Sequence, residues 1–167
     1  VDSIRVDDIA DGAGCSTATI HNHFPNALPD ILAAISEDII QAAFKQFEKI
    51  SKDFSGIELV RSYFKTVGEH ISEQADVAVP SIAISVDLAS QGSWFDRKIF
   101  SDCKELFKTA KETEQINGSH DQLASLTHTF FQGALYSWAL GSITSEEFLR
   151  MSTESVDFAV SSCRGTA

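Results

Sequence analysis

Two long apolar stripes between residues 27 and 75 restrict the fold more than any other feature of this sequence. Within residues 27–50, apolar side chains recur every three or four positions, and Pro29 falls in the first turn, where its missing N–H does no harm. Gly56 interrupts the pattern, and a second stripe follows over residues 57–75. Because this spacing places side chains on one face of an α-helix, we predict two consecutive long helices.

Residues 77–90 carry a mixed signal. Ile82, Ile84 and Val86 alternate as they would in a strand, yet no partner strand is visible elsewhere and Pro80 suits the start of a helix. We therefore predict a helix here.

The last part of the chain favours three more helices. The first begins after Ser93 and ends before the turn-forming pair Asn117-Gly118. The other two span residues 120–141 and 145–163, and the second opens with a capping box from Thr144 to Glu147. With only nine glycines and three prolines in 167 residues, the whole pattern predicts an all-α protein.

Composition limits the class of protein. No run of eighteen apolar residues exists, and three widely spaced cysteines fit reduced thiols used in packing, so a cytoplasmic protein is expected. The net charge of −11 excludes a protein that coats nucleic acid over its whole surface. Any contact with DNA is therefore expected to be local.

The N-terminal residues predict a helix-turn-helix. Residues 6–13 have the spacing of a short amphipathic helix, and Gly14 follows where helices commonly stop. Ser16 is a good N-cap for a second short helix, which Pro25 closes. Two short helices joined by a glycine-containing turn form this motif.

Residues 3–35 resemble the DNA-binding segment of the TetR family of bacterial transcriptional regulators. In that family a Ser or Thr precedes an Ile-Ala helix, and Ala-Gly-x-Ser then leads into a recognition helix that ends in His-Phe. The sequence has these motifs in the same order and at matching spacing, as Ser3, Ile9-Ala10, Ala13-Gly14-Cys15-Ser16 and His23-Phe24-Pro25. The family also has a helix ahead of this segment, so the resemblance implies a head that lacks its first helix.

The sequence departs from the family at several positions. Ala18 stands where the family usually has Gly, His21 where it has Tyr, and Asn26 and Ala27 where a phosphate-binding Lys is usual. Residues 1–26 also carry a net charge of −3, which is acidic for a surface that faces DNA.

The resemblance implies a DNA-reading site on the second short helix. Thr17, Ala18 and Asn22 would face bases, and Ser3, Thr19 and His21 would face the DNA backbone. The expected set of DNA-binding residues is Ser3, Ser16, Thr17, Ala18, Thr19, His21, Asn22 and His23. Because His21 and His23 are two positions apart on a helix, they point to different sides, and no metal site is expected.

The resemblance also implies how the rest of the chain is used. It divides the chain into a DNA-binding domain with the start of the connecting helix, residues 1–47, and a ligand-binding and dimerisation domain, residues 48–167. Two chains would pair through residues 120–141 and 145–163 into a homodimer that binds a palindromic operator of double-stranded DNA. A small-molecule effector would release that operator, as in a repressor.

A ligand pocket among the middle helices is a further implication. His128 is either a buried, hydrogen-bonded core residue or a polar group of such a pocket. The candidate lining residues are Phe64, Trp94, Phe100, Cys103, Thr127, His128 and Phe131.

Two other functions remain open from the sequence. A helical ligand-binding or protein-interaction module that has lost DNA binding is favoured by the acidic head and the missing Lys. An enzyme is the weaker alternative, because the sequence has no nucleophile elbow, phosphate-binding loop or Cys-x-x-Cys motif. We expect no enzyme and no cofactor.

Overall fold

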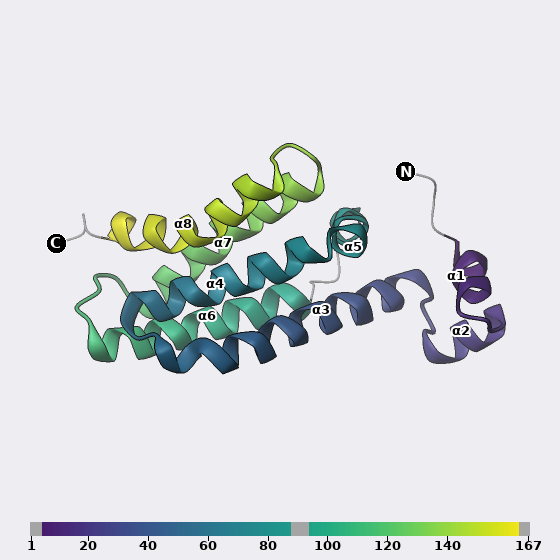
Figure 1. Cartoon of the computed structure of the whole chain (residues 1–167), viewed down its shortest axis with the longest axis horizontal. Helices are drawn as coiled ribbons and strands as arrows, with labels where there is room; N and C mark the ends of the chain where they lie inside the picture. The colour runs from purple at the N-terminus through teal and green to yellow at the C-terminus, as the bar shows by residue number, and fades with distance from the viewer. Residues whose placement is uncertain (1–4, 88–93, 164–167) are drawn as a thin grey trace.

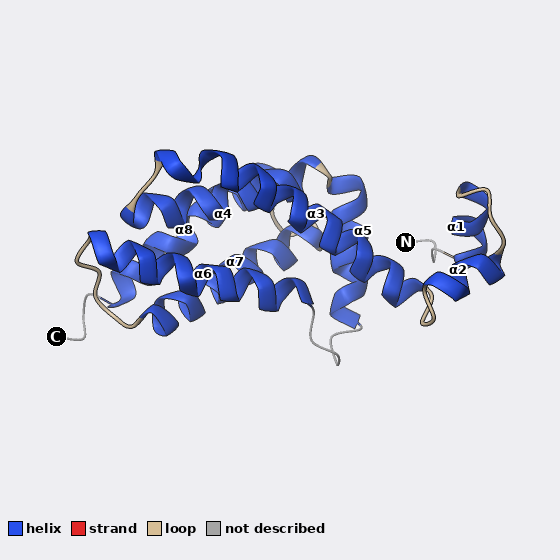
Figure 2. Cartoon of the chain, turned by 90° about the horizontal axis from the view of Figure 1, so that it is seen from below, coloured by secondary structure: helices blue, strands red, loops and turns tan. Residues whose placement is uncertain are grey.

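The computed structural model describes residues 5–87 and 94–163, without the side chains of residues 83–97. Within these ranges the chain forms eight α-helices and one short 3-10 helix and contains no strand (Figure 2). The fold is therefore all-α, as predicted.

The two long apolar stripes form the two helices expected of them. Helix α3 spans Leu28–Ile50, with Pro29 in its first turn, and α4 spans Gly56–Glu73. The short 3-10 helix Ser51–Asp53 lies between them. One face of each helix is buried and the other faces solvent, which is why the stripes are visible in the sequence.

Helix α5 spans Ala75–Asp87, which confirms the predicted helix as far as Asp87. The remaining predicted positions, 88–90, lie outside the described residues. The prediction that Pro80 marks a helix start is wrong, because Pro80 lies inside α5. The helix begins earlier, where the carbonyl of Gln74 accepts hydrogen bonds from the N–H groups of Val77 and Ala78 at 3.0 and 2.8 Å. Pro80 removes one donor from the next turn, and that loss does not break the helix.

Three helices complete the chain: α6 over Trp94–Thr113, α7 over His120–Ala139 and α8 over Ser145–Ser162. The predicted capping box is confirmed at the start of α8. The Thr144 hydroxyl accepts from the N–H of Glu147 at 3.1 Å, and the Glu147 carboxylate accepts from the N–H of Thr144 at 2.8 Å. These two bonds satisfy backbone donors that a helix start leaves without partners.

Helix α4 is the central element of the main hydrophobic core. It packs against α3, α6 and α8, and its residues Val60, Phe64 and Val67 are fully buried. Aromatic rings then extend the core from α4 to α8. Phe64 contacts Phe131 at a centroid distance of 5.1 Å, and Phe131 contacts Phe148 at 5.9 Å.

The first two helices lie outside this core. Helix α1 spans Val6–Gly12 and α2 spans Thr17–His23, and we call residues 5–26, which contain them, the head. Figure 1 shows the head at one end of the molecule and the last turn of α8 near the other, with α3 reaching from the bundle to the head. A small second apolar cluster holds the head on the first turns of α3, and its buried members are Ala10, Ile20 and Ile31.

One side chain belongs to both apolar clusters. Ile35, in the second turn of α3, is partly buried and packs against the small head cluster and against the main core. Each cluster is otherwise made of its own residues, so α3 is both the covalent and the apolar link between head and bundle.

Candidate nucleic-acid interface

Helix α2 buries Ile20 and exposes most of its polar residues. Ser16 is the N-cap, as predicted, and its hydroxyl accepts from the N–H of Thr19 at 3.1 Å. Ile20 is buried and Phe24 is partly buried, both in the head cluster. This anchoring fixes which side of α2 faces solvent.

Three hydroxyl groups of the predicted DNA-binding set are engaged within the head. Thr17 donates a hydrogen bond to the carboxylate of Asp7 at 3.0 Å, which ties α2 to α1. The hydroxyl groups of Ser16 and Thr19 lie 2.9 Å apart and share a hydrogen bond. These groups stabilise the helix pair, so a contact with a base would have to replace an existing bond.

The exposed residues of α2 are Ala18, Thr19, His21, Asn22 and His23. Among the described residues, none forms a hydrogen bond with the side chain of His21, Asn22 or His23. The predicted set therefore contains three polar side chains that are available to a partner. Ser3 also belongs to that set, but it lies outside the described residues.

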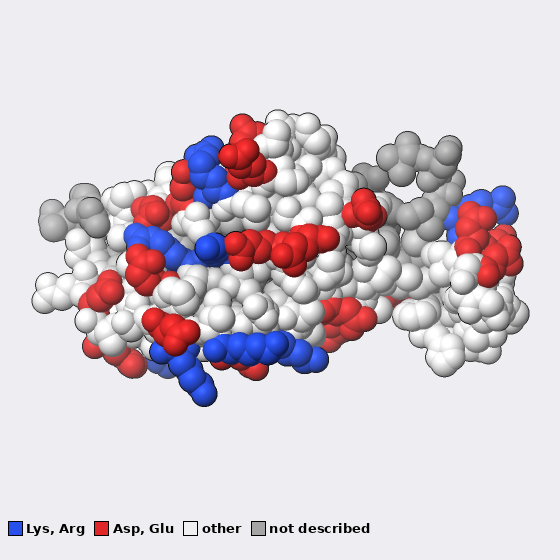
Figure 3. All heavy atoms as spheres, in the orientation of Figure 1, with Lys and Arg blue, Asp and Glu red and all other residues white. Residues whose placement is uncertain are grey.

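The electrostatic character of the head comes from α1. Asp7, Asp8 and Asp11 are exposed. Arg5 pairs with Asp7 at 3.1 Å and partly neutralises the charge of that carboxylate. Figure 3 shows acidic side chains gathered on the head. This negative surface opposes the approach of a polyanion, so binding of DNA would depend on a narrow contact through α2.

Four of the predicted pocket residues lie in the main core. Phe64, Cys103, Thr127 and Phe131 are at most 1% exposed. Burial raises the pKa of the Cys103 thiol well above its usual range, so this thiol stays protonated and fits a packing role.

The remaining pocket candidates lie nearer the surface. Phe100 and His128 are partly buried and meet edge to face, with their ring centroids 5.6 Å apart. Trp94 is the first residue of α6, and its side chain lies outside the described part of the structure. The structure therefore brings Phe100 and His128 together.

Thr127 is the one buried polar side chain for which no hydrogen-bond partner exists among the described residues. Its hydroxyl is fully buried on α7. A buried hydroxyl without a partner costs roughly 1–3 kcal/mol relative to a satisfied one. Thr127 is therefore an unsatisfied polar group within the predicted pocket set, and no sequence signal marked it as such.

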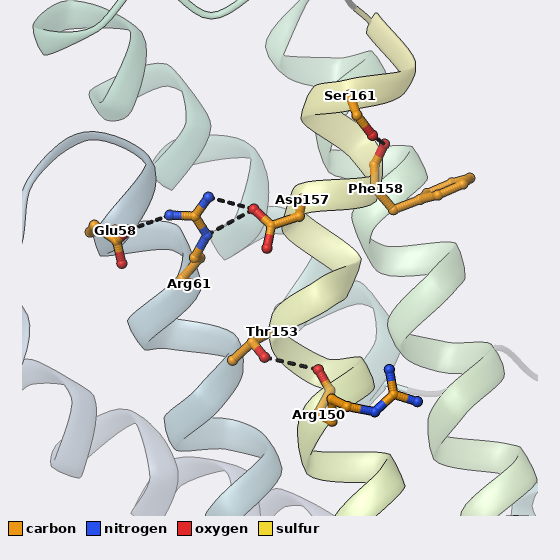
Figure 4. A network of polar contacts seen from close by, with 7 residues as sticks. All are labelled: Glu58, Arg61, Arg150, Thr153, Asp157, Phe158 and Ser161. Carbon is orange, nitrogen blue, oxygen red and sulfur yellow. Dashed lines mark hydrogen bonds and ion pairs between the residues drawn. The ribbon is translucent and has the colours of Figure 1, made fainter.

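An open groove with a volume of about 540 Å³ lies far from the head. Helix α4, the segment before α7, and helices α7 and α8 line it. Figure 4 shows its polar centre, where Arg61 of α4 binds Glu58 of the same helix and Asp157 of α8. The hydrogen bond that Arg61 donates to Asp157 raises the pKa of Arg61, and the ion pair links α4 to α8.

Phe158 gives the same groove an apolar side. It is 45% exposed on α8, and its ring lies against that of Phe130 of α7 at a centroid distance of 5.2 Å. Figure 4 shows Phe158 pointing away from Arg61. The sequence predicts no site here, because Arg61 and Asp157 are 96 positions apart and no local spacing connects them.

Comparison of the chain with models of known families, with curated proteins and with solved structures finds no match. Within the described ranges, no three His, Cys, Asp or Glu side chains are grouped so that they could hold a metal ion. No helix in the same ranges has the length and the apolar character needed to cross a membrane.

Proposed function

We propose that this protein is a DNA-binding transcriptional regulator of the TetR type, with α2 as its recognition helix. The observation that carries the proposal is the exposed polar face of α2, which the head cluster holds at the far end of α3. An exposed, anchored short helix of this kind can enter the major groove, where Asn22 can donate and accept hydrogen bonds at base edges. Ala18 beside it can contact a thymine methyl group.

A homodimer through α7 and α8 would supply the second recognition helix. The described part of the chain exposes four large hydrophobic residues, and two of them, Leu140 at 66% and Phe158 at 45%, lie at or on these helices. Leu126 and Phe130 add partly buried apolar area on the same side of α7 as Gly133. This surface favours a symmetric interface in which each chain presents the same two helices.

The proposed dimer has a geometric consequence for its target. Two heads that read successive major grooves must lie about 34–36 Å apart, and the operator must be palindromic. A small ligand that binds the bundle better when the heads are wrongly spaced would lower the affinity for the operator.

The test is a gel-shift assay with the full-length protein and the DNA upstream of its own gene, at low and at raised salt. We expect a retarded band that weakens as salt rises, because phosphate contacts release counterions. The absence of a band at both salt concentrations would remove the DNA-binding proposal.

A matched pair of variants separates a contact through α2 from a general effect of charge. Asn22→Asp places a carboxylate on the exposed face of α2, and Gln46→Glu makes the same amide-to-carboxylate change at an exposed position of α3. The first should weaken DNA binding roughly ten-fold or more, since a base contact contributes about 1–3 kcal/mol. The second should leave the affinity within about two-fold, since it lies outside the proposed contact surface.

The second candidate function is a helical ligand-binding or interaction module without DNA binding. The specific observation in its favour is the acidic α1 beside α2, where Asp7 also engages the hydroxyl of Thr17. A dimer seen by light scattering together with no retarded band would favour this candidate.

A further inference from the structure

Helix α3 connects the bundle to the head, so a change in its tilt would move the head. Figure 1 and Figure 2 both show it extending out of the bundle toward α1 and α2. Phe44 lies in its bundle half and Ile31 in the head cluster, 13 residues away, which corresponds to about 20 Å of helix. A tilt of roughly 10° about Phe44 would therefore displace the head by about 3.5 Å.

Apolar packing holds α3 in the bundle, and a directional contact can make its orientation more precise. Ile39, Ile40 and Ala43 anchor α3 in the main core, but the hydrophobic effect that holds them is not directional. A contact that depends on geometry can add this constraint.

Lys98 of α6 makes such a contact with α3. Its ammonium group lies 4.3 Å from the centre of the Phe44 ring, in a cation–π arrangement. The same ammonium binds both carboxylate oxygens of Asp102, one turn further along α6, at 2.5 and 2.6 Å. Lys98 is thus held by Asp102 in the one position that places its charge over an aromatic ring of α3.

Tyr63 of α4 completes the cluster from the other side. Its hydroxyl donates to Asp102 at 3.2 Å, and its ring stacks on Phe44 at 5.9 Å and meets Phe47 edge to face at 5.2 Å. Burial, together with the nearby charge of Asp102, raises the pKa of Tyr63 well above 10, so the hydroxyl remains a donor. Helices α3, α4 and α6 therefore meet at one charged and aromatic cluster.

We propose that Lys98 is a positioning residue for the head: through Phe44 and Asp102 it fixes the direction of α3, and thereby the place of α2. Its significance for DNA recognition rests on the function proposed above, but its effect on the position of the head does not. Charge-assisted hydrogen bonds and cation–π contacts have preferred geometries, so they add a directional constraint to the apolar packing of α3.

The test compares Lys98→Met with Lys104→Met. Both lysines lie on α6, both bind a carboxylate, Asp102 or Asp121, at 2.5 Å, and their side chains are 37% and 39% exposed. Lys104 pairs with the start of α7 and makes no such contact with α3. The control thus removes an ion pair of the same length from an equally exposed lysine, with a carboxylate that is more exposed, at 58% for Asp121 against 25% for Asp102.

The measurement is the distance between a spin label at position 22 and one at position 108, in full-length chains diluted with an excess of unlabelled chain. Both positions are exposed, and coupling through non-cysteine side chains leaves the native thiols unchanged. Lys98→Met should shift or broaden the distance distribution by about 3 Å or more, and Lys104→Met should reproduce the wild type. Lys98→Arg keeps the cation and should restore most of the wild-type distribution.

An unchanged distribution in Lys98→Met, or an equal change in Lys104→Met, would overturn the proposal. If Lys98→Met fails to fold, Phe44→Leu removes the ring and keeps the Lys98–Asp102 pair, and it should produce the same displacement. If the distances change as expected and the unlabelled wild type does not bind DNA, the positioning role stands and the regulator proposal fails.

Discussion

Gly68 offers a sharp test of how closely α4 and α8 pack. It is buried in the middle of α4, facing α8. A Cβ atom added there would lie 2.8 Å from Oγ of Ser152 and 3.1 Å from its Cβ, both closer than ordinary contact. We therefore expect Gly68→Ala to destabilise the protein, although alanine is the better helix former.

Two opposing effects set the magnitude. Replacing glycine by alanine inside a helix stabilises it by about 1 kcal/mol. Overpacking a filled interior costs about 1–3 kcal/mol. The Ser152 hydroxyl cannot turn away without loss, because it is fully buried and donates to the carbonyl of Phe148 at 2.8 Å. We expect a net loss of roughly 1–2 kcal/mol in the free energy of unfolding.

Urea denaturation is the assay, with Gly133→Ala as the matched control. Gly133 is also inside a helix, but it is exposed on α7, and no described atom lies within 4 Å of an added Cβ. If light scattering shows that the protein is a monomer, Gly133→Ala should raise the free energy of unfolding by up to about 1 kcal/mol. Ser152→Ala removes the nearer of the two clashing atoms, so combined with Gly68→Ala it should show a favourable coupling of about 0.5 kcal/mol or more.

Two results would refute this reasoning. One is a Gly68→Ala protein as stable as the wild type, which would mean that the two helices move apart without loss. The other is strict additivity of the two substitutions, which would mean that residues 68 and 152 are not in contact.

Ser16→Ala should weaken the α2 helix by about 1 kcal/mol, which hydrogen exchange of its amides measures; unchanged exchange would contradict the cap. Ala27 has a φ of +56°, which favours glycine, so Ala27→Gly should raise the midpoint of thermal unfolding, and a lower midpoint would argue against strain. The backbone hydrogen bond from Thr144 lowers the pKa of Glu147 below its ordinary 4.5. The contribution of the Glu147 carboxylate to folding stability is therefore present above that pH and disappears as the pH falls. The stability difference between wild type and Glu147→Ala should therefore shrink in acid, while the exposed Glu146→Ala should show a smaller difference throughout.

The helices were predictable because their signals are local. Apolar spacing marked α3 and α4, and a hydroxyl followed three residues later by a carboxylate marked the start of α8 at Thr144. Pro80 was misleading because a proline is most common in a first turn, whereas a helix already stabilised by packing tolerates one further inside.

The candidate sites were predictable only in part. Ser16 was found because capping depends on neighbours in the chain. The links Arg61–Asp157 and Tyr63–Asp102 join residues 96 and 39 positions apart, so only the folded chain reveals them. The spacing of Lys98 and Asp102, one helical turn apart, was visible in the sequence, but the contact of Lys98 with Phe44 was not.

The positions of aromatic residues in the sequence could not locate a pocket. A residue such as Phe64 that packs inside a bundle and one that lines a cavity occupy the same face of a helix, so periodicity cannot separate them. Burial in the folded chain makes that distinction.

The packing of Ile35 against both apolar clusters affects how the protein unfolds. Because a single partly buried isoleucine connects two otherwise separate apolar clusters, little free energy ties the opening of the first two helices to the opening of the remaining six. The N-terminal pair should therefore exchange its amide hydrogens and admit proteases through local events, long before the larger core unravels.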